Sequence, residues 1–354
     1  MASRIRPLAT VLALALTVAP TAYAQVKVDH TLRSTVENVK RGFISADTPP
    51  VLRVKSGQTV RIDTISHGGV TEDPVAFFAG AGIPPEGVLE DVKAIAKVSS
   101  TSGWAGHILT GPIYVEGAEP GDMLEVRIHA VEPRVPYGVN NPGPGGAAPG
   151  ILKERVSRII KFDVKRKMVM NAPGVETPLA PFMGIMAVAP GEPRRVGSRA
   201  PGEFGGNLDF AKLVVGSTLY LPVFQPGALF VTGDSHAQQG DGEVSGNALE
   251  ASMTPTLQFI VHKGVGKGMI PWAEDAKNFY IMGMDKDLDV ALTRAIEETV
   301  KFLVAKKGLT PAEAYSLCST SIDFAVAEAV DENLIMYGTV RKSWFKTKTP
   351  YWTK

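Results

Sequence analysis

One eleven-residue segment, 233–243, contains an unusual number of side chains that can bind a metal ion or transfer a proton. Its sequence, GDSHAQQGDGE, contains two Asp, one His, one Glu and three Gly. Asp234 and His236 are two positions apart, so on an extended segment their side chains point to the same side. A hard carboxylate beside an imidazole suits a divalent metal ion. Glu243 is close enough in sequence to reach back as a general base on a metal-bound water. Composition alone leaves open an Asp/Gly-rich turn with a surface histidine.

Two further histidines stand at the edges of predicted β units. His67 follows a strand that ends at 63–66, and His107 precedes a strand that begins near residue 109. Binding sites form at such edges, where loops leave the scaffold, but a single histidine there is also typical of a structural or exposed residue. The other histidines lie in ordinary strand-like or terminal contexts, and we assign them no role: His30, His129 and His262.

Motifs for other chemistries are absent from the sequence. There is no G-x-S-x-G elbow, no C-x-x-C and no H-E-x-x-H, so a serine hydrolase of the α/β type and a helical zinc motif have no support. Cys318 is the single cysteine, so no intrachain disulfide can form, and its apolar surroundings predict a buried small hydrophobe.

Strands must position most of these residues. The alternating segment 50–65 predicts two strands with a turn at Gly57, and 112–131 predicts a similar unit. A third apolar strand, 228–232, leads into segment 233–243 and places it at a strand end. With 36 Gly and 26 Pro, the composition favours a β-rich, loop-rich fold. We expect an antiparallel N-terminal β domain over 25–132.

The next segment, 133–150, has ten Gly or Pro in eighteen positions. This composition predicts no regular element, so the segment is either a linker or an ordered loop over a site. The remaining part, 151–354, is predicted to contain strands and then an α+β end. It carries segment 233–243. The predicted fold class is therefore mainly β with an α+β C-terminal part.

The C-terminal helices have clear sequence signals. Apolar residues from Leu288 to Leu303 recur at helical spacing, and Gly308 ends the pattern. A second helix begins with Thr310 as N-cap and Glu313 three positions later, which is a capping box. Two closing strands are then predicted at 325–330 and 334–340.

The first 24 residues have the three-part layout of a secretory signal peptide. Arg4 and Arg6 precede an apolar run over 8–19, and Ala22-Tyr23-Ala24 forms an A-x-A cleavage pattern. We expect cleavage after Ala24, a periplasmic or secreted protein, and no stable membrane insertion afterwards. The formal net charge of +1 gives no electrostatic reason to expect nucleic acid as a partner.

Three stretches together resemble the acetamidase/formamidase family: Thr110–Asp122, Gly205–Asp209 and Gly233–Glu243. Their order and separation also fit, and the resemblance extends over roughly 30–340. It implies a β-sandwich-like part with smaller subdomains, homo-oligomers, and hydrolysis of small linear amides to carboxylate and ammonia. It also implies a divalent metal ion, zinc first of all, that activates a water molecule.

By position, the resemblance implies that His107, Asp234 and His236 are metal ligands and that Glu243 transfers protons. Asn207 would line the substrate pocket and serve as a donor to the reacting oxygen. The sequence departs from the family pattern at 66–70, which reads SHGGV where better-known members have an Asp followed by Gly-Gly-Gln. Either His67 acts as a further ligand there, or the site is rebuilt.

Segment 70–103 also looks enlarged, and Phe77-Phe78 and Ile83-Pro84-Pro85 are expected to reshape the pocket. Two alternatives therefore stay open. One is a non-catalytic periplasmic binding protein that keeps the scaffold and the metal. The other is a hydrolase of a cyclic amide or an ester. Glu243 discriminates between binding and hydrolysis, because a binder needs no carboxylate poised beside a metal ion.

Overall fold

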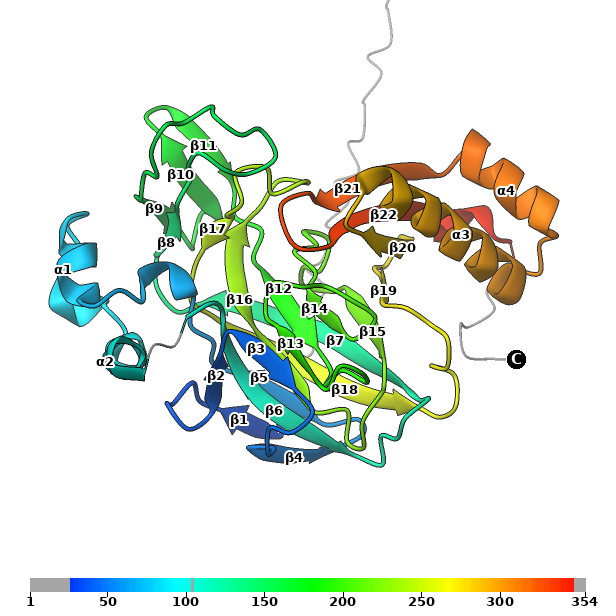
Figure 1. The fold of residues 1–354 in the computed structure, drawn as a ribbon, viewed down its shortest axis with the longest axis horizontal. Coiled ribbons are helices and arrows are strands. Elements are labelled where there is room, and N and C mark those ends of the chain that lie inside the picture. Colours follow the sequence, from blue (N-terminus) through cyan, green and yellow to red (C-terminus); the bar gives the residue numbers. More distant parts are fainter. Residues whose placement is uncertain (1–25, 103–104, 347–354) are drawn as a thin grey trace, which may run out of the picture.

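The structure is a computed structural model that describes residues 26–102 and 105–346; the predicted signal segment 1–24 lies outside the described residues. Strands dominate these residues, and helices cluster at two separate places (Figure 1). The predicted fold class, mainly β with an α+β C-terminal part, is confirmed. No helix in the described ranges is both long enough and apolar enough to cross a membrane.

Two large sheets form the body of the described chain. One has nine strands in the order β1 (His30–Leu32), β5 (Thr59–Ile62), β18 (Met253–His262), β7 (Met123–Pro133), β15 (Thr218–Pro222), β19 (Trp272–Glu274), β20 (Asn278–Asp285), β22 (Leu334–Arg341) and β21 (Asp323–Glu328). The other has eleven: β11 (Val175–Pro178), β10 (Met168–Ala172), β9 (Arg158–Asp163), β8 (Tyr137–Asn140), β17 (Leu249–Glu250), β16 (Phe230–Gln238), β12 (Phe182–Ala187) and β14 (Gly205–Asn207), with β6 (Ile108–Glu116) joining β16 to β2 (Val39–Arg41) and β4 (Leu52–Lys55). A small pair consists of β3 (Phe43–Ser45) and β13 (Arg195–Gly197).

The two strand–turn–strand units are confirmed, but each crosses from one sheet to the other. Strand β4 joins the eleven-stranded sheet and β5 the nine-stranded one, and β6 and β7 divide in the same way. The largest apolar core lies between them and contains Val54, Ile62, Ile113 and Val126. The prediction of an antiparallel N-terminal β domain needs correction, because β2 pairs with β6 antiparallel but β1 pairs with β5 and β4 with β6 in parallel. Parallel neighbours need a long crossover connection, and long stretches of chain separate β1 from β5 and β4 from β6.

The two predicted halves of the chain share both sheets. Strand β7 pairs with β18 over ten positions, and β6 pairs with β16. The expectation that 133–150 holds no regular element is wrong, since β8 lies within this segment. It pairs with β9 and β17, which lie outside it. Gly138 makes this strand possible, because a Cβ there would lie 2.8 Å from the carbonyl oxygen of Glu250.

The predicted C-terminal helices are confirmed with their caps. Helix α3 (Leu288–Lys307) ends at Gly308, whose φ of +70° is in the left-handed region, and the capping box of Thr310 and Glu313 begins α4 (Pro311–Thr320). Helix α3 packs against β20 and β22 (Figure 1). Cys318 is buried there, as predicted.

Segment 70–103 contains two helices that the sequence analysis did not predict. Helix α1 (Pro74–Ala79) is capped by the Asp73 carboxylate, and α2 (Glu90–Ser102) follows the short helical turn η2 (Pro85–Gly87). They lie at the opposite side of the molecule from α3 and α4 (Figure 1). Two more short helical turns occur, η1 (His67–Gly69) and η3 (Lys342–Trp344). A separate apolar cluster packs α1 and α2 onto β8 through Phe78, Ile95 and Tyr137.

Candidate metal centre

Strand β16 carries Asp234 and His236 through the middle of the eleven-stranded sheet. Segment 233–238 therefore lies inside a strand and not after its end, because β12 pairs with one edge of β16 and β6 and β17 with the other. Asp234 has φ +49°, a left-handed conformation that Asp tolerates better than most residues. Asp234 and His236 are 3% and 0% exposed, so the alternative of a surface histidine is excluded.

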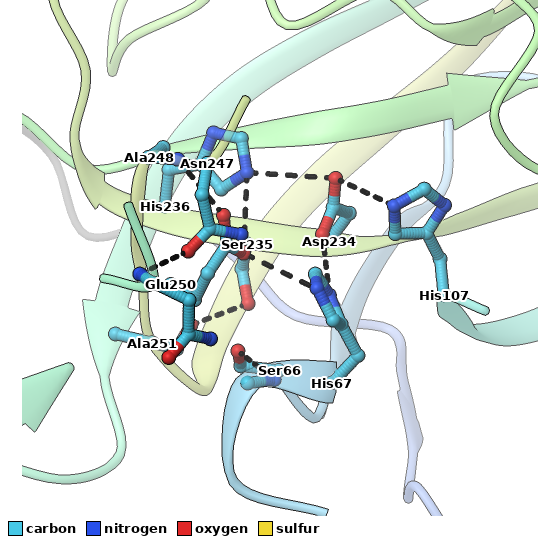
Figure 2. Close-up of polar contacts among 12 residues, drawn as sticks. Ser66, His67, His107, Asp234, Ser235, His236, Asn247, Ala248, Glu250 and Ala251 are labelled. Atoms are coloured by element: carbon cyan, nitrogen blue, oxygen red, sulfur yellow. Dashed lines mark hydrogen bonds and ion pairs between the residues drawn. The ribbon is translucent and has the colours of Figure 1, made fainter. Parts of the chain in front are cut away.

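Three histidines converge on the Asp234 carboxylate. Its Oδ1 lies 3.1 Å from Nδ1 of His67, which comes from the turn η1. Its Oδ2 lies 3.7 Å from Nε2 of His107, just before β6, and 3.5 Å from Nε2 of His236. Figure 2 shows the three rings directed at this one carboxylate. The structure thus brings together all four residues that were predicted as ligands, including His67 from the divergent segment.

Glu250 completes the cluster, and the sequence analysis missed it. It lies on β17 directly opposite His236, with its Oε2 3.4 Å from Nε2 of His236 and 3.9 Å from Nδ1 of His67 (Figure 2). The side chain is only 2% exposed. A glutamate inside the apolar run Ala248-Leu249-Glu250-Ala251 was the available signal, since a buried carboxylate requires a partner.

Hydrogen bonds set which ring nitrogen of each histidine faces the cluster. Nδ1 of His236 lies 3.0 Å from Oε1 of Gln239, whose amide nitrogen donates to the Asp209 carbonyl at 2.6 Å. The oxygen of Gln239 can only accept, so the neutral form of His236 carries its proton on Nδ1, and its Nε2 is then available to a metal ion. Nδ1 of His107 lies 3.0 Å from the Ser198 hydroxyl, and its Nε2 likewise faces Asp234.

The donor atoms fit a divalent metal ion. Nε2 of His236 and Oε2 of Glu250 are fully buried, yet neither makes a hydrogen bond of good geometry with a described residue. Such orphaned atoms are costly unless something binds them. Two triads offer ligand atoms within 4.8 Å of one another, His67–His107–Asp234 and Asp234–His236–Glu250. Imidazole nitrogen and carboxylate oxygen together suit zinc and other divalent ions of its kind.

The electrostatics of the cluster favour a cation among its carboxylates. Burial disfavours the ionised form of Asp234, but His107, His236 and His67 outweigh it and hold the pKa of Asp234 well below its usual range. Burial also disfavours a charged His236, yet Glu250 and Asp234 raise its pKa well above the ordinary value. Positive charge is therefore stabilised at the centre of the cluster.

Glu243 lies beside this cluster in a second arrangement of acids. A carboxylate oxygen of Glu243, one of Asp209 and a ring nitrogen of His236 all lie within 4.8 Å of one another. Burial is the main reason why the pKa values of Glu243 and Asp209 stand well above the ordinary range. Glu243 is 9% exposed, so a carboxyl group with raised proton affinity reaches the edge of the cluster.

Asn207 lies on β14 among carboxylates. Its Nδ2 donates to Oδ2 of Asp209 at 2.6 Å and to Oδ2 of Asp331, which uses both amide protons. Its Oδ1 is buried and has no hydrogen bond with a described residue. Asp331 comes from the turn between β21 and β22 and also lies 3.7 Å from Arg199. The sequence analysis missed Asp331, which is 124 positions from Asn207.

The fold and the site define a β protein of two large sheets with a histidine–carboxylate cluster around the buried Asp234. The chain belongs to the acetamidase/formamidase family, whose sequence model matches residues 29–200 and 192–337. The predicted family resemblance is thereby confirmed.

Known relatives are similar at modest identity. A putative formamidase of Schizosaccharomyces pombe is 28% identical over 254 residues, which span 56% of this chain and 58% of the relative. The acetamidase of Mycolicibacterium smegmatis is 28% identical over 39% of this chain and 49% of its own length. The chain thus spans about half to three fifths of these relatives.

Solved structures cover more of the chain. An acetamidase from Bacillus halodurans has a TM-score of 0.74 and 27% identity, covering 89% of this chain and 98% of its own. An acetamidase from Yersinia enterocolitica has a TM-score of 0.73 and 27% identity, covering 90% of this chain and 93% of its own. The sheet arrangement that positions the cluster therefore occurs in proteins named acetamidase.

Proposed function

We propose that this protein is a metal-dependent hydrolase of small linear amides that yields a carboxylate and ammonia. The observation that carries the proposal is the convergence of His67, His107 and His236 on the buried carboxylate of Asp234. Membership of the acetamidase/formamidase family supports the choice of an amide as the substrate. Zinc is the proposed ion, held by these four residues with Glu250 as a further donor.

When bound, a divalent ion supplies Lewis-acid chemistry that activates water at neutral pH and polarises an amide carbonyl. The chain's own contribution begins with the fixed tautomer of His236. Because Gln239 Oε1 accepts a hydrogen bond from Nδ1, the neutral His236 ring presents an unprotonated Nε2 to the cluster. The same hydrogen bond restrains rotation of the ring. The sheet around β16 buries Asp234, His236 and Glu250, which strengthens the electrostatic interactions among them, while His67 and His107 remain partly exposed.

Glu243 is the proposed proton-transfer residue. It would accept the proton of the attacking water and pass it to the nitrogen of the tetrahedral intermediate as the C–N bond breaks. An amide anion is a very poor leaving group, so this transfer decides whether ammonia departs. The raised pKa of Glu243, caused first by burial, suits a group that must both take and return a proton.

Asn207 takes a role different from the one we expected. Both of its amide protons are already given to Asp209 and Asp331, so it does not fit as a donor to the reacting oxygen. Its unpartnered Oδ1 instead fits an acceptor for an N–H of the substrate amide. We propose that Asn207 orients the leaving nitrogen.

Ammonia release tests the proposal. Purified protein would be incubated with formamide, acetamide, longer linear amides and lactams, first as isolated, then after chelation, and again after zinc is restored. The proposal expects ammonia from the linear amides, its loss with chelator and its return with zinc. Saturable binding of amides without ammonia from fully metallated protein would favour a binding protein, and release from lactams alone would favour a cyclic substrate.

We also propose that the enzyme acts after export, on the basis of the signal segment at 1–24. N-terminal sequencing of the protein from the periplasm or the medium should begin at Gln25. Self-association is proposed from the family resemblance alone, and light scattering of the purified protein would measure it.

A further inference from the structure

A small cavity lies between the helices of segment 70–103 and the metal-ligand cluster. Its walls come from η1, β8, β17 and the two helices, and include Gly69, Phe78, Val92, Tyr137, Val139 and Glu250. Most of these groups are apolar, and Glu250 supplies a carboxylate. The free volume is about 20 Å³, which is room for about one water molecule or one methyl group.

The cavity adjoins the proposed reaction centre. Glu250 belongs to the wall of the cavity and is also a member of the cluster, where it faces His236 at 3.4 Å, so the cavity adjoins the cluster at this residue. Ser66 and Gly69, on either side of His67, line it as well. A second hollow, around Tyr114 and Arg194, includes none of the cluster residues. The substituent on an amide carbonyl lies one bond from the reacting carbon, so it must enter space next to the donors.

Phe78 is a buried part of this wall that is packed on two sides. Its ring is 5% exposed and lies 4.9 Å from the ring of Tyr137, whose hydroxyl donates to the Gly87 carbonyl at 2.8 Å. A Cβ on Gly69 would lie only 2.2 Å from the Phe78 ring, so glycine is what lets the ring approach η1. One wall of the cavity is thus an aromatic ring packed between η1 and β8.

We propose that this cavity is the acyl-group subsite and that Phe78 sets the longest acyl chain the enzyme accepts. The inference rests on the proposed amide hydrolysis and names its substrate range. Formamide and acetamide fit, because the acyl substituent is a hydrogen atom or one methyl group. Propionamide and butyramide exceed the free volume unless the wall moves, and Phe78 is the group that would have to move.

Shortening Phe78 tests the proposal against a matched neighbour. In Phe78→Ala, kcat/KM for propionamide relative to acetamide should rise about tenfold or more, since one methylene in a tight pocket is worth 10–200-fold. Phe77→Leu is the control: Phe77 does not line the cavity, and leucine keeps an apolar contact with the Phe78 ring, whose centroid lies 5.1 Å from that of Phe77, so the ratio should stay within about twofold of wild type. Phe78→Leu, a smaller loss of packing, should shift the ratio in the same direction.

Each of the following outcomes supports or overturns the proposed acyl-group subsite. An unchanged chain-length profile in Phe78→Ala with intact acetamide turnover overturns the subsite while amide hydrolysis stands. If Phe78→Ala fails to fold, the ratio measured for Phe78→Leu decides. If wild type releases no ammonia from any amide, the proposed function fails. In that case, the affinities of the same amides for wild type and Phe78→Leu are compared by calorimetry. A relative gain in affinity for the longer amides in Phe78→Leu supports the subsite, and an unchanged order of affinities overturns it.

Discussion

Nδ1 of His236 lies 3.0 Å from Oε1 of Gln239, and the amide nitrogen of Gln239 donates to the Asp209 carbonyl at 2.6 Å. The backbone carbonyl fixes which way the Gln239 amide points, and the amide in turn fixes the tautomer of the histidine. A side chain outside the cluster therefore determines whether Nε2 of His236 is available as a ligand.

Replacing Gln239 by Ala should weaken metal binding about 10–100-fold, because partners that orient metal-ligating histidines have effects of that size. Competition with a chelator indicator would measure the affinity. Gln238→Ala is the control, because the Gln238 side chain bonds Thr177 and the Pro178 carbonyl outside the cluster. Equal affinities in the two variants would remove Gln239 from the account.

Asp234→Asn should retain the fold and lose the metal. Asn tolerates the left-handed backbone at this position (φ +49°), so the strand keeps its shape, while the one carboxylate shared by three histidines becomes neutral. We expect an affinity loss of more than about 100-fold with an unchanged circular dichroism spectrum. Metal content near that of wild type in the purified variant would contradict the central place of Asp234.

Glu243→Gln separates metal binding from proton transfer. Gln keeps the shape of the side chain but cannot accept a proton, so turnover of acetamide should fall by about 10²–10⁴-fold while the bound metal is retained. Elemental analysis of the same preparation that is assayed would check both halves. A near-normal rate would show that another group moves the proton.

Local signals predicted the C-terminal part of the fold well. The end of α3 at Gly308 and the capping box of Thr310 and Glu313 depend on residues a few positions apart, which the sequence shows directly. Helix α1 was missed because it is only six residues long and packs onto β8, a strand that the Gly/Pro content of 133–150 did not predict.

The site was predictable where its members share a segment. Asp234, His236 and Glu243 lie within ten positions, and the family resemblance added His107. Glu250 depends on strand register, because only the pairing of β17 with β16 sets it opposite His236. Asp331 depends on a turn of the other sheet, which no local pattern places beside Asn207.

Glu328 should make stability depend on pH. Its carboxyl group is fully buried, and burial, with the nearby Asp331, raises its pKa to about 7. An acid with a raised native pKa stabilises the fold at low pH, and this contribution is lost as pH rises from about 4.5, the pKa of the unfolded group, through about 7. In Glu328→Gln this loss of stability at rising pH disappears, because Gln does not titrate. The Gln side chain can still accept hydrogen bonds from the backbone N–H groups of Val330 and Asp331.

The free energy of unfolding of Glu328→Gln, relative to wild type, should therefore increase by up to about 3 kcal/mol between pH 5 and pH 8. Urea unfolding at the two pH values measures it. Glu332→Gln, an exposed change in the same turn, is the control and should show no such difference. A relative stability of Glu328→Gln that does not change with pH would contradict a native pKa near 7.

Amide hydrolysis by this protein is proposed to depend on an ion held by the histidine–carboxylate cluster. The most direct test of this dependence is to titrate metal-free protein with zinc and to record bound zinc and ammonia release from acetamide in the same samples. We predict no turnover without zinc and a rate that rises in proportion to occupancy of the cluster, with both signals lost in Asp234→Asn. Full acetamide turnover by the metal-free protein would contradict it.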